Sequence, residues 1–149
     1  MASEKERQVV VQGTAKDFRQ EVSWGPFHLI GDEPVELGGG DTGPGPYEFL
    51  LIALGTCTSM TIGMIARQRG WPVTGVRVTL RHDRIHAEDC KECETKRGMV
   101  DHIVREIEID GDLTKEQRAT LFSIAQRCPV ATTLTSEIRI EDHLGPAAA

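Results

Sequence analysis

The amino-acid sequence predicts an α+β fold in a single domain, residues 1–149. Short segments in which apolar and polar residues alternate are typical of half-buried strands, and they flank two segments of helical character. Their order is three strands, a long helix, two strands, a second helix and a last strand, so strands and helices are partly segregated along the chain. The 149 residues suffice for one hydrophobic core, and neither an internal repeat nor a long linker divides them.

The first three strands are expected before residue 31. Valines open a short strand at residues 9–11, and strict alternation follows over residues 18–24. A Gly-Pro turn at residues 25–26 then leads into a returning strand at residues 27–30. Residues 38–46 contain seven glycines and prolines, which predicts a loop before the long helix.

The long helix is predicted over residues 46–69. Pro46 suits a first helical turn, where its missing N–H is harmless, and Glu48 complements the helix dipole at that end. Arg67 and Arg69 do the same in the last turn. The uncharged middle is somewhat short of the roughly 20 apolar residues of a membrane span and is diluted by small polar residues. We therefore expect a central helix of a soluble protein, buried on all sides, and no membrane association.

The rest of the chain follows the same two periodicities. Thr114 and Gln117 have the spacing of a capping box, so a helix is expected to begin there and to carry Cys128 on its apolar stripe. The expected elements are strands at residues 76–81, 103–109 and 137–141 and a helix over residues 114–128.

Charge and composition exclude several function classes. A net charge of −6 with scattered basic residues offers no field for nucleic acid or an acidic membrane surface. Aromatic residues make up 5% of the chain, which also argues against base stacking. The polar N-terminal residues 1–7 lack the apolar core of a signal peptide, so we expect a cytoplasmic protein with reduced thiols. Its four cysteines are then catalytic, metal-binding or inert.

Cys57 and Cys128 are the candidate reactive thiols. Cys57 lies in the middle of the long helix, where burial raises a thiol pKa, so reactivity requires a cationic partner from elsewhere. An inert core cysteine is the competing interpretation. Cys128 precedes Pro129, which disfavours helical backbone at Cys128. If a new helix starts at Pro129, Cys128 caps it and its thiolate is stabilised by free N–H groups; otherwise it is a buried cysteine at a kink.

Cys90 and Cys93 form a CxxC pair with two interpretations. One is a redox dithiol, but the pair lacks the strand-to-helix context of a thioredoxin-like motif and its acidic neighbours would raise a thiol pKa, which leaves an exposed, regulatory loop. The other is a metal site, since His82 and His86 precede the pair and four N/S ligands suit zinc. A single CxxC is a weak zinc signature.

Two motifs carry a resemblance to a known family. Residues 43–61, with sequence GPGPYEFLLIALGTCTSMT, resemble the central helix of the OsmC/Ohr family, and Cys-Pro-Val at residues 128–130 resembles its second cysteine motif. The turn at residues 32–34 and the strand order agree as well. The HAEDC-x-x-CE sequence of residues 86–94 is similar to a branch of the family that carries a CxxC loop.

The resemblance implies an intertwined homodimer in which antiparallel sheets wrap around the long buried helix, with active sites at the subunit interface. It also implies thiol-dependent reduction of organic hydroperoxides in stress defence, without a cofactor. Cys57 is then the peroxidatic thiolate and Cys128 the resolving thiol. An external dithiol, in some members a lipoyl group on a protein, reduces the enzyme. The family's activating arginine comes from the N-terminal strands, where Arg19 is the candidate; a solvated strand arginine is the competing interpretation.

One position departs from the family pattern. In well-studied members a glutamate ten positions before the reactive cysteine orients the arginine, and this chain has Tyr47 there. Glu48 lies nine positions before Cys57, which at about 100° per residue is the opposite side of the helix. The activating network therefore differs. Two further functions stay open: a redox or zinc sensor built on the CxxC loop and its histidines, and a module that binds an apolar ligand.

Overall fold

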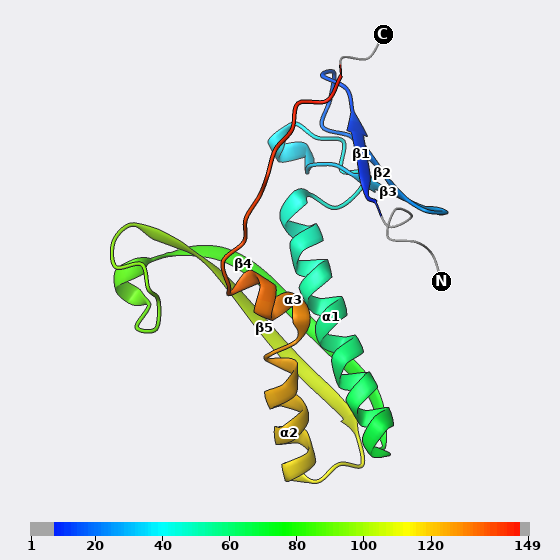
Figure 1. Cartoon of the computed structure of the whole chain (residues 1–149), viewed down its shortest axis with the longest axis vertical. Coiled ribbons are helices and arrows are strands. Elements are labelled where there is room, and N and C mark those ends of the chain that lie inside the picture. The colour runs from blue at the N-terminus through cyan, green and yellow to red at the C-terminus, as the bar shows by residue number, and fades with distance from the viewer. Residues whose placement is uncertain (1–7, 147–149) are drawn as a thin grey trace. The chain divides into compact units, whose positions relative to one another are not determined.

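The computed structural model describes residues 8–146 (Figure 1). The chain forms two compact units, each built from two separate stretches. The first unit contains Met1–Ile52 and Arg81–Val104, and the second contains Ala53–Leu80 and Arg105–Ala149. Each unit is described by itself below. The α+β class expected from the sequence is confirmed, whereas the expectation of a single domain stays a prediction.

A three-stranded antiparallel sheet forms the N-terminal part of the first unit. Its strands are β1 (Val10–Gly13), β2 (Gln20–Trp24) and β3 (Phe27–Gly31), in the order β1-β2-β3. Val22 lies opposite Val11 on one side and Leu29 on the other, so apolar residues share one register across the sheet. The three predicted N-terminal strands are confirmed.

Asp32 organises the loop between this sheet and the long helix. Its carboxylate accepts a hydrogen bond from the Thr42 hydroxyl at 2.6 Å. It also accepts hydrogen bonds from the backbone N–H groups of Glu33, Gly40 and Thr42 at 2.8–3.3 Å. These hydrogen bonds, that of the Thr42 side chain first, lower the pKa of Asp32 to about 2 although burial opposes the shift. Asp32 N–H in turn donates to the Pro44 carbonyl at 3.0 Å. The loop therefore enters the helix along a defined path.

Helix α1 spans Pro46–Arg69, as predicted, with Glu48 in its first turn and Arg67 and Arg69 in its last. The expectation that it is buried on all sides is wrong for the described chain. Its buried residues form one stripe at helical spacing, whereas on other faces Met60 is 68% exposed and Met64 45%. The buried residues are Leu54, Gly55, Thr58, Ile62 and Ala66. By length and composition, α1 is the one helix of the described residues that could span a membrane.

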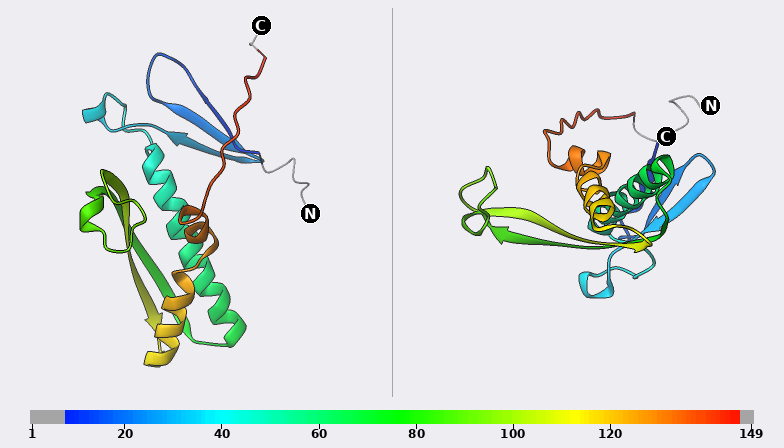
Figure 2. Two further views of the ribbon diagram at one scale, coloured as in Figure 1. Left: turned by 60° about the vertical axis from the view of Figure 1, so that its left-hand side comes forward. Right: turned by 90° about the horizontal axis from the view of Figure 1, so that it is seen from below.

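The second unit has its core between helices and the C-terminal sheet. Strands β4 (Val73–His86) and β5 (Met99–Gly111) form a two-stranded sheet, and α2 spans Lys115–Ala125. In the right-hand view of Figure 2, α1 and α2 run side by side over the part of this sheet that belongs to the second unit, residues 73–80 and 105–111. Their fully buried contact consists of Ile62, Leu121 and Ala125. Apolar residues of both strands pack against it, including Val76, Ile107 and Ile109.

Local signals set the ends of the C-terminal helices. Thr114 and Gln117 form the predicted capping box at the start of α2. The helix ends at Ala125, three residues earlier than expected. Cys128 has extended backbone, φ −59° and ψ 153°, because it precedes Pro129, and it is the N-cap of a new helix, α3 (Pro129–Leu134). Of the two interpretations of Cys128, a helix N-cap and a buried cysteine at a kink, the structure agrees with the N-cap.

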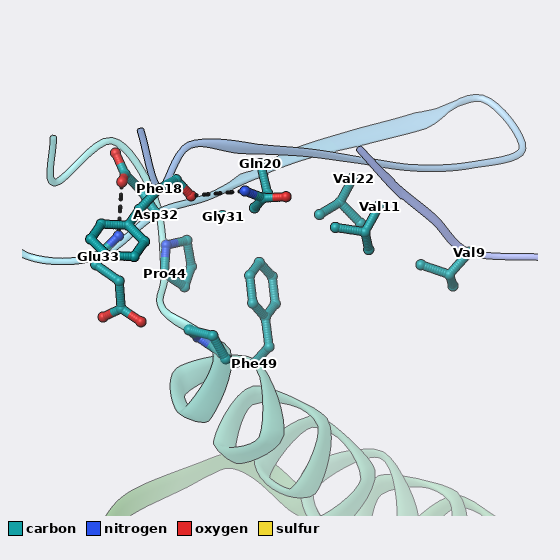
Figure 3. Close-up of a pocket in the computed structure, with 11 residues that line it drawn as sticks. Val9, Val11, Phe18, Gln20, Val22, Gly31, Asp32, Glu33, Pro44 and Phe49 are labelled. Atoms are coloured by element: carbon teal, nitrogen blue, oxygen red, sulfur yellow. Dashed lines mark hydrogen bonds between the residues drawn. The ribbon is translucent and has the colours of Figure 1, made fainter. Parts of the chain in front are cut away.

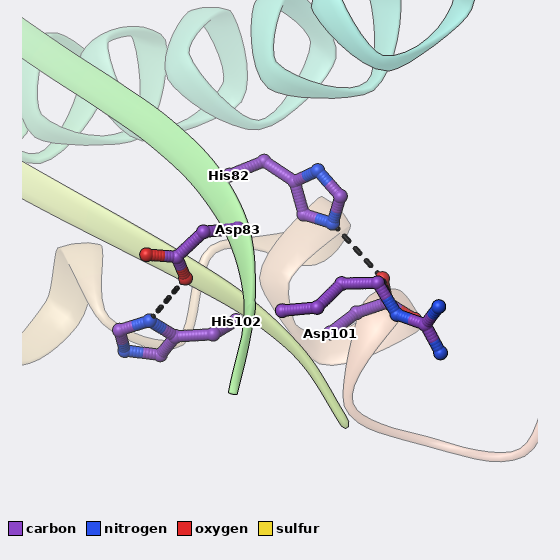
Figure 4. Close-up of polar contacts among 5 residues, drawn as sticks. His82, Asp83, Asp101 and His102 are labelled. Atoms are coloured by element: carbon purple, nitrogen blue, oxygen red, sulfur yellow. Dashed lines mark hydrogen bonds and ion pairs between the residues drawn. The ribbon is translucent and has the colours of Figure 1, made fainter. Parts of the chain in front are cut away.

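Two parts of the strand prediction need correction. Strands β4 and β5 run further than expected because polar pairs extend the hairpin beyond its apolar stretch: His82 pairs with Asp101, and His102 with Asp83 (Figure 4). The predicted strand at residues 137–141 is wrong, since those residues have no regular secondary structure. Alternation alone does not make a strand, because its backbone needs a hydrogen-bonding partner.

Candidate thiol site

Cys57 and Cys128 lie together at the N-terminus of α3, inside the second unit. Cys57 comes from α1, and its Sγ accepts the backbone N–H of Val130 at 3.4 Å. Cys128 is the N-cap of α3, and its thiol is hydrogen-bonded to the thiol of Cys57. The chain thus brings a mid-helix cysteine and a Cys-Pro cysteine, 71 positions apart, into contact.

The two sulfurs differ in accessibility. Cys128 is completely buried, with 0% exposure, whereas Cys57 is half-buried. Cys57 lines an open depression with a volume of about 500 Å³ on α1. Its other walls are mostly apolar or small side chains: Ala53, Thr56, Met60, Thr61, Met64 and Pro129. A small apolar molecule in this depression reaches the sulfur of Cys57 and not that of Cys128.

Arg105 is the cationic group of the site. Its Nη1 donates to the Thr58 hydroxyl at 2.8 Å, to the Ala125 carbonyl at 3.2 Å and to Cys128 Sγ at 3.7 Å. Its Nη2 donates to the Gln126 carbonyl at 3.4 Å. The guanidinium is therefore held between β5, α1 and the last turn of α2, with one edge on the buried thiol.

These contacts favour the thiolate of Cys128. Burial by itself raises the pKa of that thiol. Hydrogen bonds from the Ala131 N–H and from the side chains of Thr58, Cys57 and Arg105 outweigh burial, so that the pKa of Cys128 lies below its usual value. Thr58 is itself anchored, because its hydroxyl lies 2.6 Å from the Leu54 carbonyl. The site is a pair of neighbouring thiols in which the groups around the buried member favour its thiolate.

Comparison with known proteins decides the family. The model of the OsmC family, described as OsmC-like protein, matches residues 38–142, which contain both thiols and Arg105. The chain belongs to the OsmC family. Among curated proteins, none matches it significantly.

Solved structures of OsmC proteins share the fold. A putative osmotic stress induced and detoxification response protein from Psychrobacter arcticus is 21% identical, with a TM-score of 0.63 over 84% of this chain and 85% of that one. An organic hydroperoxide resistance protein OsmC from Legionella pneumophila is 17% identical, with a TM-score of 0.61 over 86% and 89%. The organic hydroperoxide resistance protein OhrB of Bacillus subtilis is 14% identical, with a TM-score of 0.59 over 86% and 89%. At these identities the likeness concerns the fold.

The arginine on the thiols of this OsmC protein is one that the sequence interpretation missed. Arg105 shares parity with Ile103, Ile107 and Ile109, so it stands at an inward-facing position of an alternating strand. An arginine on the apolar face of a strand could have identified this site from the sequence, because a charge placed there needs hydrogen-bonding partners inside the protein. The sequence candidate, Arg19, lies in the first unit, where it contacts Thr42 at 3.4 Å and Glu21 at 3.9 Å. Its role at the thiols stays a prediction.

Tyr47, at the position of the OsmC family glutamate, has a different task. Its ring stacks on that of His82, with centroids 4.6 Å apart and planes 8° apart. Arg105 is oriented instead by the Thr58 hydroxyl and by the backbone carbonyls of Ala125 and Gln126. Main-chain oxygens and the Thr58 hydroxyl thus hold the arginine of this site.

The alternative metal set is not assembled. Cys90 and Cys93 form a disulfide, with Cα atoms 5.4 Å apart, although reduced thiols were expected. His82 Nε2 is paired with Asp101 Oδ1 at 3.0 Å (Figure 4). Within residues 8–146, no group of three or more His, Cys, Asp or Glu side chains is arranged to hold a metal ion, and His86 joins none. The physical reason is that the two sulfurs bond to each other and His82 is engaged by its neighbours.

The first unit contains an apolar pocket of its own, with a volume of about 610 Å³ (Figure 3). Val11 and Val22 point into it from the sheet, and Phe49 of α1 points toward them from the other side. Of its polar residues, Asp32 and Glu33 lie at one end and Gln20 lies between them and Val22. Because the Asp32 carboxylate is already occupied by loop hydrogen bonds, the pocket offers mainly apolar contact.

Proposed function

We propose that this protein reduces organic hydroperoxides by thiol chemistry at Cys57 and Cys128. The observation that carries the proposal is the contact between an accessible and a buried, arginine-bound thiol at one helix N-terminus. Relatives of the same fold are named organic hydroperoxide resistance proteins, which supports the same chemistry here. The apolar depression beside Cys57 suits the organic part of such a substrate.

Cys57 is the attacking group, because its sulfur is the accessible one. The Cys128 thiolate, hydrogen-bonded to the Cys57 thiol, accepts its proton. Cys57 thiolate then attacks the terminal oxygen of the hydroperoxide: an S–O bond forms, the O–O bond breaks, and the alkoxide leaves and is protonated to an alcohol. Arg105 remains charged throughout and stabilises the negative charge of the thiol pair.

Cys128 completes the oxidation. Its sulfur attacks the sulfenic sulfur of Cys57, an S–S bond forms, and the hydroxyl leaves as water. One hydroperoxide and two thiols thus become one alcohol, one water and one disulfide. An external dithiol, with a lipoyl group on a protein as the candidate, restores the thiols by attacking the more accessible Cys57.

A homodimer in the cytoplasm is part of the proposal. Apolar residues on α1 remain exposed in the single chain, at fractions of 44–68%, which a second copy would cover. These residues are Leu50, Ile52, Met60 and Met64. A reducing compartment would supply the dithiol that the cycle needs.

The test is consumption of cumene hydroperoxide by the full-length protein with an excess of a dithiol. Cys57→Ser is expected to abolish turnover. Cys128→Ser, treated with the hydroperoxide in the absence of dithiol, is expected to react more slowly, because it lacks the thiolate that accepts the Cys57 proton, and to leave a sulfenic acid on Cys57 that a dimedone adduct reveals. The matched control is the double variant Cys90→Ser/Cys93→Ser, which should keep the wild-type rate. Unchanged consumption by Cys57→Ser would refute the proposal.

The pocket of the first unit favours a second candidate function, binding of an apolar ligand. Its lining by Val11, Val22 and Phe49 suits an acyl chain. Titration with a fluorescent fatty acid would show saturable binding that Val22→Asp removes while Val10→Asp, a change on the same sheet outside the pocket lining, leaves it intact. Equal binding by both variants would exclude this pocket as the ligand site.

A further inference from the structure

The loop that joins β4 to β5 is closed by its main chain. Ala87 N–H donates to the Gly98 carbonyl at 2.8 Å, directly beyond the last residues of the two strands. A short 3₁₀ helix, Ala87–Asp89, follows, and Cys90 N–H donates to the Ala87 carbonyl at 3.2 Å. The Cys90–Cys93 disulfide is added to a loop whose ends the hairpin already holds.

This disulfide contributes little to the stability of the fold. It joins residues only three positions apart. The stabilisation that a cross-link contributes through chain entropy grows with the length of chain it closes, so a ring this small contributes least. A structural disulfide usually joins distant segments of a small core, which is not the arrangement here.

The disulfide is accessible to another thiol. Cys90 and Cys93 are half-buried, and the loop residues on both sides of each of them are exposed. Thiol–disulfide exchange requires an attacking thiolate in line with the S–S bond, so an exposed loop is a place where exchange can occur.

Charge distinguishes the two sulfurs. Lys96 Nζ donates to the Cys93 carbonyl at 2.7 Å, so that an ammonium group is held beside Cys93. Both cysteines have charged neighbours in the chain, Asp89 and Lys91 beside Cys90 and Glu92 and Glu94 beside Cys93, so the charge that distinguishes them is the Lys96 ammonium held at the Cys93 carbonyl. A neighbouring cation stabilises a departing thiolate and a neighbouring anion opposes one, and the thiol that is more stable as thiolate leaves faster. Cys93 is therefore the better leaving group, and Cys90 is the sulfur that receives attack.

We propose that Cys90 and Cys93 form a second thiol–disulfide exchange site, separate in its residues from Cys57 and Cys128, that reacts with an external dithiol. The dithiol's thiolate bonds to Cys90 Sγ, the Cys90–Cys93 bond breaks, and Cys93 Sγ leaves with the electron pair beside Lys96. The second thiolate of the dithiol then attacks the dithiol sulfur that is bonded to Cys90. This releases Cys90 as a thiolate and leaves the dithiol oxidised to an intramolecular disulfide. Two electrons pass to the loop, and the oxidised dithiol reverses the reaction.

The first experiment uses the full chain with Cys57→Ser/Cys128→Ser, so that only the loop cysteines react. The folded protein is equilibrated with mixtures of reduced and oxidised dithiothreitol, quenched with acid, alkylated and weighed by mass spectrometry. We expect the two thiols to appear and disappear together and reversibly. A disulfide that resists a dithiol excess in the folded chain but yields after denaturation would overturn the proposal, as would two free thiols that stay reduced in an excess of oxidised glutathione, a stronger oxidant than the cyclic disulfide of dithiothreitol.

The second experiment locates the attack. A brief exposure to a monothiol, quenched with acid, leaves a mixed disulfide on one cysteine. Trypsin cleavage after Lys91 places Cys90 and Cys93 on different peptides, so mass spectrometry identifies the modified one. We expect the adduct on Cys90. Lys96→Gln should slow the reduction several-fold, whereas the matched loop variant Lys91→Gln should change it less. An adduct mainly on Cys93, or equal effects of the two lysine variants, contradicts the assigned direction of attack.

Discussion

Replacing Arg105 by methionine should raise the pKa of the thiol pair. Arg105 Nη1 lies 3.7 Å from Cys128 Sγ and 2.8 Å from Thr58 Oγ1, which itself lies 3.7 Å from the sulfur. A hydrogen bond to a charged group contributes about 1.5–3 kcal/mol. The contact to sulfur is long, so we take the lower end of that range. About 1.4 kcal/mol corresponds to one pKa unit. We therefore expect a rise of about one unit, because the variant lacks the cation that favours the thiolate.

The assay is a pH titration of thiolate ultraviolet absorbance in Cys90→Ser/Cys93→Ser protein, which keeps Cys57 and Cys128. The two thiols interact, so the first apparent pKa belongs to the pair. Below that pKa, a rise of about one unit lowers the thiolate fraction about tenfold, and hydroperoxide consumption should fall by a similar factor.

Two variants control for charge and for folding. Arg105→Lys keeps a cation and should raise the pKa less than Arg105→Met. Arg77→Gln removes another strand arginine of the second unit, whose ion pair with Glu108 at 3.7 Å is exposed and contributes little. If Arg105→Met titrates like Arg77→Gln, Arg105 is not the group that stabilises the thiolate.

Two further predictions concern stability. Asp32→Asn should destabilise the fold near neutral pH by loosening the loop before α1. The pKa of Asp32 is lowered to about 2, so its contribution is present above about pH 4 and disappears as the pH falls toward about 2. Urea unfolding of both proteins should show a difference that shrinks across this range, and a constant difference would exclude the carboxylate as its source. Leu121→Ala removes a fully buried side chain from the contact with Ile62 and should lower the free energy of unfolding by about 2–5 kcal/mol. Phe122→Ala, next to it but 45% exposed, should cost clearly less, and equal losses would contradict the described core.

Local signals predicted elements well where short-range chemistry decides them. Pro46 and the terminal charges marked both ends of α1, and the Thr114–Gln117 capping box marked the start of α2. Cys128 before Pro129 pointed to a helix break and a new N-cap. Each of these depends on the backbone within a few residues, which is why sequence alone reveals it.

Predictions failed where a distant partner decides the outcome. Residues 137–141 alternate like a strand, yet Ile140 is 78% exposed and the segment has no regular structure, because pairing requires another strand. The apolar middle of α1 indicated burial on every side, but the single chain covers only the stripe around Thr58 and Ile62. Periodicity shows which face is apolar and does not show what covers it.

The sequence by itself determined the family motifs, the helix ends and the two thiols worth attention, since residue type and spacing carry that information. Only the tertiary structure decided how the thiols are used. Packing of α1, β5 and the α2–α3 junction places Arg105 and the N-terminus of α3 against Cys128 and leaves Cys57 open to solvent. Accessibility and pKa depend on groups distant in the chain, so they appear only when folding brings these elements together.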